Sequence, residues 1–222
     1  MSELLKGVLT VIVSTLLISA MFILLNLISG RNIPFGWAAF IGALFGVGYG
    51  LEAGIVGIYP LSTFRGWVEL LDDTTWSLPN TLFGFVFGNC IYPFFGSITK
   101  SQSKDKGWIV YMPASTSTRF GSSVLQTLGT INLGGSGQHE RMHLLQARIL
   151  GPLYLSIYAI NYIVTFLIQL LWTFTMGGLL WLLKVRNKPY FSPSGHSAVQ
   201  GFFGWIYYAT IFELWAYASG NP

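Results

Sequence analysis

Charge and cysteine are both scarce in this chain of 222 residues. Only 9% of the residues are charged, whereas about one-quarter is usual for a soluble domain. Eight acids and twelve bases cannot cover a water-exposed surface of this size, and 52% of the chain is hydrophobic. The single cysteine, Cys90, excludes an internal disulfide and a cysteine-based zinc cluster. The formal charge of +4 is too small and too scattered for nucleic-acid binding. The composition therefore predicts an integral membrane protein whose main partner is lipid.

Four apolar runs are long enough to cross a bilayer as helices, which takes roughly 20 residues. They cover residues 7–28, 35–58, 153–183 and 199–218. The first run is too long for the core of a signal peptide, so we expect a retained span. In the second, glycines 42, 46 and 50 recur at every fourth position and predict close packing against another helix. We predict a polytopic α-helical membrane protein with about four transmembrane helices.

The organisation expected is a single membrane domain, 1–222, in three parts. Residues 1–60 form a two-helix hairpin, residues 61–137 a polar segment with a small amount of β-structure, and residues 138–222 the remaining helices. The runs 108–112 and 123–128 are typical of strands. The apolar stretch 82–95 is short and contains Pro93, which favours a re-entrant or interfacial segment over a full crossing.

Isolated acids in and near the spans need an explanation. Glu52 lies within the second run, where an acid is a functional candidate by default. The alternative interpretation is that it pairs with Arg65 or with a backbone donor. Asp72 and Asp73, beside two threonines, are typical of a helix N-cap or a turn.

Basic residues predict the orientation in the membrane. With four crossings, eight of them fall on the side of the termini and four on the opposite side. Basic residues favour the cytoplasm, so both termini and the central polar segment are expected there.

One cluster of residues carries recognisable chemistry. His139 and His143 stand four apart, which places both imidazoles on one face of a helix, within reach of one zinc ion. Glu140, between them, is positioned to take a proton from a metal-bound water. The alternative is a helix start at which Glu140 stabilises the N-terminal dipole and the histidines bond to backbone or water.

A zinc site of this kind needs a third protein ligand. Glu213 is the preferred candidate because it is an acid in an apolar helix and needs a partner. It lies fourteen residues beyond Val199, roughly 21 Å along one continuous helix, and so near the cytoplasmic end of the last span. His196 is disfavoured, since its loop falls on the opposite side of the membrane. The same loop places Ser194 near His196, but no acid accompanies them, which argues against a serine hydrolase.

The pattern His-Glu-x-x-His resembles the zincin metallopeptidases. With Glu213 as third ligand it resembles the gluzincin subgroup, in which a downstream helix supplies the glutamate. That resemblance implies peptide hydrolysis with Glu140 as general base and a Zn²⁺ cofactor. No residue is assigned to the oxyanion, although Tyr217 and Tyr158 are available.

A second resemblance covers more of the chain. Trp76-Ser-Leu-Pro-Asn-Thr81, Thr127-Leu-Gly129, the His139 motif with Gln146, Gly151-Pro152 and Phe212-Glu213 are similar to segments of uncharacterised bacterial proteins. This similarity associates Glu213 with the histidines, and we expect Gln146 and Tyr217 to orient a ligand or the substrate.

The sequence thus predicts a zinc-dependent hydrolase of peptides in a bacterial inner membrane. The alternative is a non-catalytic subunit of a larger membrane complex, in which any metal would be structural. A transporter component is disfavoured because the chain has no repeated halves.

Overall fold

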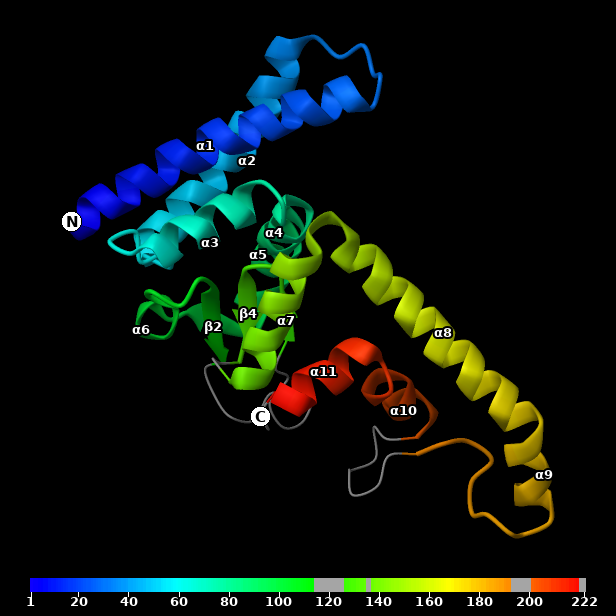
Figure 1. Ribbon diagram of the computed structural model, residues 1–222. Helices are drawn as coiled ribbons and strands as arrows, with labels where there is room; N and C mark the ends of the chain where they lie inside the picture. Colours follow the sequence, from blue (N-terminus) through cyan, green and yellow to red (C-terminus); the bar gives the residue numbers. More distant parts are fainter. Residues whose placement is uncertain (114–125, 135–136, 193–200, 220–222) are drawn as a thin grey trace. The chain divides into compact units, whose positions relative to one another are not determined.

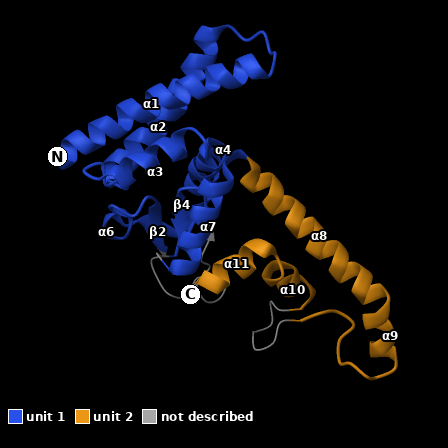
Figure 2. Ribbon diagram, viewed as in Figure 1, with its two compact units in different colours: residues 1–152 blue, residues 153–222 orange. Residues whose placement is uncertain are grey.

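The chain folds into two compact units, residues 1–152 and 153–222. They are coloured separately in Figure 2. The computed structural model describes residues 1–113, 126–134, 137–192 and 201–219. The described residues contain three helical stretches long and apolar enough to cross a membrane: Glu3–Ile28, Phe35–Val56 and Gln138–Leu182.

Helices α1 (Glu3–Ile28) and α2 (Phe35–Val56) form an antiparallel hairpin (Figure 1). A Cβ atom added to Gly42 or Gly46 would lie 2.6 Å from the Cα of Ser19 or Thr15 on α1, and at Gly50 it would lie 2.8 Å from the Cα of Val11. No side chain fits at such separations, so the backbones of α1 and α2 approach along this row of glycines. The predicted close packing at these three positions is confirmed.

Short helices follow the hairpin. They are α3 (Phe64–Thr74), α4 (Leu78–Phe83), the π-helix η1 (Gly84–Gly88), α5 (Asn89–Ile91), the 3₁₀ turn η2 (Tyr92–Phe94) and, after one strand, α6 (Lys100–Ser103). Residues 82–95 therefore continue α4 through a π-helical turn and end in a 3₁₀ turn, so that the stretch is helical but is not one regular α-helix. Pro93 lies within the last of these turns, where the apolar stretch leaves helical structure.

A small mixed sheet completes the polar part of the first unit. Its strands are β1 (Gly96–Ile98), β2 (Ile109–Pro113), β3 (Gln126–Leu128) and β4 (Ile131–Leu133), in the order β1-β2-β4-β3. Strand β2 is antiparallel to β1 and parallel to β4, and β3 is antiparallel to β4. The predicted strand at 108–112 is confirmed, as is the end of the one at 123–128, of which residues 123–125 lie outside the described residues.

The first unit closes with α7 (Gln138–Leu150), after which the 3₁₀ turn η3 (Gly151–Leu153) leads into the second unit. That unit contains α8 (Tyr154–Phe174), α9 (Met176–Leu182), α10 (Phe202–Tyr208) and α11 (Ile211–Ser219). Within this unit, Gln169 joins α8 to Phe191 and to the start of α10. Its side-chain amide donates to the carbonyls of Phe191 and Phe202 and accepts from the Phe191 N–H.

The prediction of one continuous helix over residues 199–218 is wrong. The described part of this run divides at Ala209 and Thr210 into two short helices. The Thr210 hydroxyl donates to the carbonyl of Tyr207 and accepts from the N–H of Glu213 at 3.4 Å, so it ends one helix and begins the next. The distance of 21 Å expected between Val199 and Glu213 therefore does not apply.

Candidate metal centre

His139 and His143 lie on the buried face of α7, one turn apart. Their Nε2 atoms are 3.2 Å from one another. Two nitrogens bound at 2.0–2.1 Å to a tetrahedral zinc ion lie about 3.3–3.4 Å apart. The same contact also suits a hydrogen bond between two neutral imidazoles, in which one ring donates its Nε2–H to the Nε2 lone pair of the other. The predicted juxtaposition of the two histidines is confirmed, with a separation that matches two ligands of one ion.

Gln146 orients the second of these imidazoles. Its Oε1 lies 3.0 Å from Nδ1 of His143, and its side chain is fully buried. An amide oxygen only accepts, so this contact places the ring proton on Nδ1 and leaves Nε2 with a lone pair. A hydrogen-bond acceptor behind a histidine is typical of metal ligands. Gln146 thus contacts one of the two predicted ligands, and its role at a metal site stays a prediction.

Glu140 is buried in the first turn of α7 and is held from strand β3. The hydroxyl of Thr127 donates to its Oε2 at 2.6 Å, and the amide of Asn132 donates to the Thr127 hydroxyl at 3.1 Å. This chain of hydrogen bonds fixes the carboxylate to the sheet. Neither Thr127 nor Asn132 was predicted to act at the site, although Thr127 opens one of the segments from which the second resemblance was predicted.

The carboxyl-terminal end of α7 is capped by residues 76–80. Trp76 and Ser77 donate to the carbonyls of Ile149 and Ala147, and Asn80 donates to those of Ala147 and Gly151. The last carbonyls of a helix lack a regular partner in a following turn, and buried ones require a donor. That of Ala147 also accepts from the Gly151 N–H. Gly151, at φ +52°, ends the helix in a conformation that other residues rarely adopt. Residues 76–80 therefore fix the position of the helix that bears the histidines.

A buried ion pair anchors the last turn of the same helix to α3. Arg148 forms a bidentate contact with Asp73 of α3, at 2.9 Å from Nε and 2.7 Å from Nη2. It also donates to the Gly107 carbonyl and lies 3.4 Å from Glu69. The hydroxyl of Tyr59 donates to Asp73 at 2.7 Å. The prediction that Asp72 and Asp73 form an N-cap or turn is wrong: both lie in the final turns of α3, and Asp73 is wholly buried as the partner of Arg148.

The alternative pairing of Glu52 with Arg65 is also wrong. Arg65 pairs with Glu69, one turn along α3, at 2.7 Å. Glu52 accepts from the amide of Asn89 at 2.7 Å, and Asn89 accepts from the hydroxyl of Tyr111. Glu52 thus tethers α2 to α5 and the sheet.

Asp72 gives the fold a dependence on pH. Burial is the main cause that raises the pKa of Asp72 from 3.8 to about 6, and the negative charge of Asp73 is the second. The folded protein therefore holds this proton more tightly than the unfolded chain, and stability falls as pH rises from about 4 to about 6. We expect Asp72→Asn to raise the midpoint of thermal unfolding in detergent at pH 7, with little change at pH 4. Asp105→Asn, at an exposed acid, is the control. An equal effect of Asp72→Asn at both pH values would contradict this assignment.

The remaining predicted site residues belong to the second unit. Glu213 is buried in the first turn of α11, beside Tyr207, and burial together with the Glu213 carboxylate raises the pKa of that tyrosine. Tyr217 lies one turn further and packs against Tyr208, with ring centroids 5.7 Å apart. Tyr158 lies on α8, where its hydroxyl is 3.3 Å from that of Tyr162. Ser194 and His196 lie outside the described residues.

The donor set fits zinc chemically. His139, His143 and Glu213 are each buried and each offers one atom of a type that zinc binds. Comparison with known proteins finds no family model that matches the chain, and no curated protein or solved structure that is similar to it.

Proposed function

We propose that the protein is a membrane-embedded, zinc-dependent hydrolase, with peptides as its substrates. His139, His143 and Glu213 would hold the ion, and Glu140 would act as general base. The observation that carries the proposal is the pair of Nε2 atoms on α7, 3.2 Å apart, with Gln146 on the far nitrogen of His143. Glu213 enters as the third ligand because it is a buried acid in a helix that is otherwise largely apolar.

The chemistry divides between the ion and the chain. A bound zinc ion lowers the pKa of a coordinated water towards about 7 and polarises a carbonyl group. Glu140 would accept the proton of the attacking water and later deliver it to the departing amine, so that one carboxylate serves both steps. Thr127 holds Oε2 of Glu140 at 2.6 Å and so fixes the orientation from which that proton is taken.

A peptide as substrate is supported by the sheet beside α7. Strand β3, which carries Thr127, forms one edge of the four described strands and pairs with β4 alone among them. An edge strand offers unpaired N–H and C=O groups to an extended chain, which can add as a further strand. A chain bound in this way would run past the strand that holds the general base.

The test is substrate-independent. The zinc-loaded wild type and Glu140→Gln would each be incubated with a proteome-derived peptide mixture, and new peptide termini would be counted by mass spectrometry. The wild type should generate new termini, and the variant should lose at least about 100-fold in rate while it retains zinc, because the amide cannot accept the proton. Gln138→Glu, at an exposed position of the same helix turn, is the control. Equal rates for wild type and Glu140→Gln would refute the catalytic role. Bound zinc with no cleavage by either protein would indicate a structural site.

A further inference from the structure

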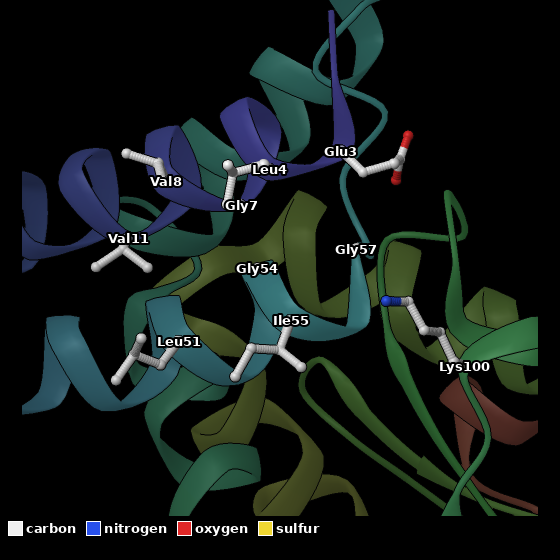
Figure 3. Close-up of a pocket in the computed structure, with 10 residues that line it drawn as sticks. All are labelled: Glu3, Leu4, Gly7, Val8, Val11, Leu51, Gly54, Ile55, Gly57 and Lys100. Atoms are coloured by element: carbon white, nitrogen blue, oxygen red, sulfur yellow. The ribbon is translucent and has the colours of Figure 1, made fainter.

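A groove of about 350 Å³ lies between the hydrophobic helices α1 and α2, at the end where α1 begins and α2 ends. Figure 3 shows the side chains around it. Its walls are mainly apolar, and its size falls within the range of small-molecule sites. The apolar residues that line it are Leu4, Val8, Val11, Leu51 and Ile55.

Two glycines create the groove. A Cβ atom on Gly54 would lie 2.8 Å from the Gly7 carbonyl oxygen, and one on Gly7 would lie 3.2 Å from that of Gly54. The two backbones therefore touch here without side chains between them. The longer residues on either side project outward and leave a hollow along the contact, which in a bilayer would face the acyl chains.

One end of this groove is basic. Lys100 lines it and has no acidic partner among the described residues. Glu3, the acid of the groove, is already shared between Lys6 at 3.0 Å and Lys104 at 3.3 Å.

Two backbone hydrogen bonds attach the basic end to the hairpin. In the turn after α6, the Asp105 N–H donates to the Gly57 carbonyl, and the Gly107 N–H donates to the Ile58 carbonyl. Three lysines, Lys6, Lys100 and Lys104, lie at this end with two acids, Glu3 and Asp105, which leaves one positive charge.

We infer that the groove binds one anionic phospholipid, with an acyl chain along the apolar walls and the phosphate against Lys100. An apolar trough that ends in excess positive charge matches the amphipathic structure of such a lipid, and a neutral zwitterionic lipid would gain only the apolar part. The site is separate from the metal centre, so it does not depend on the proposed hydrolysis.

Native mass spectrometry of the full chain, released from micelles, tests the inference. The protein would be offered equal amounts of dioleoyl-phosphatidylglycerol and dioleoyl-phosphatidylcholine, which differ only in the headgroup. The wild type should retain one phosphatidylglycerol in preference. Lys100→Gln should lower the ratio of the two adducts about fivefold, the effect of one lysine near an anionic headgroup.

Two further variants separate the groove from general surface charge. Val8→Trp, which fills the groove from a partly exposed position, should reduce both adducts, and Lys188→Gln, a lysine of the second unit, should change neither. Equal retention of both lipids by the wild type would overturn the inference, as would an unchanged ratio in Lys100→Gln. A lipid-free dimer that Val8→Trp dissociates would assign the groove to a contact between two copies instead.

Discussion

Wild-type protein purified without chelator is expected to retain about one zinc ion per chain, and His143→Ala to retain almost none. The reason is the geometry on α7: removal of one imidazole leaves a single nitrogen, which cannot hold the ion against dilution. Elemental analysis after gel filtration measures the stoichiometry. Arg141→Ala, an exposed residue between the two histidines, is the matched control and should bind as the wild type does.

Two additional variants test the contributions of Glu213 and Gln146 to zinc binding. Glu213→Ala should also lose the ion if this carboxylate is the third ligand. Gln146→Leu should keep the ion but weaken its affinity by about 10–100-fold, because the hydrogen bond behind His143 is lost. Zinc retained by Glu213→Ala but lost by His143→Ala would remove Glu213 from the site. A wild type without metal would refute the zinc proposal as a whole and favour two histidines that share a proton.

The largest effect on stability is expected at Asp73. Asp73→Asn removes the charge that Arg148 contacts through two nitrogens, and the arginine side chain is only 13% exposed. Loss of one partner of a buried ion pair costs about 3–5 kcal/mol of the free energy of unfolding. Denaturant unfolding in detergent, followed by tryptophan fluorescence, would show it.

The matched control is Arg65→Met, at the exposed end of the same ionic network, which should cost no more than about 1 kcal/mol. The double variant Asp73→Asn with Arg148→Met should recover much of the lost free energy of unfolding. Both charges of the pair are then removed, so no unpaired buried charge remains. A single Asp73→Asn variant as stable as the wild type would show that the ion pair does not anchor α7.

Local patterns were sufficient for the elements whose signals lie within one segment. The glycine row of α2 predicted close packing because a four-residue spacing places all three residues on one helix face. The apolar runs gave the first two long helices to within a few residues at each end. The spacing of His139 and His143 predicted their contact for the same reason, and Gln146, three residues on, shares that face.

Contacts between distant segments were beyond such patterns. Asp73 and Arg148 are 75 residues apart, and nothing near Asp73 in the sequence indicates an arginine as its partner. The cap that Asn80 places on α7 joins residues 67 and 71 apart. Thr210 is a weak breaker in an aromatic helix, so hydropathy could not distinguish two short helices from one span. Glu213 was assigned from its sequence context, as an acid in an apolar helix.

The partners of α7 have a consequence for the order of folding during synthesis. Arg148 and the last carbonyls of α7 bond to Asp73, Ser77 and Asn80, and Glu140 bonds to Thr127. All these partners precede α7 in the chain, so they have left the ribosome before the helix emerges, and domains generally form from the amino terminus. The helix with the two histidines can therefore dock as soon as it is made, onto a surface that is already assembled. A ribosome-bound chain just long enough for α7 to have left the exit tunnel should already protect that helix from protease, although α10 and α11 are still to come.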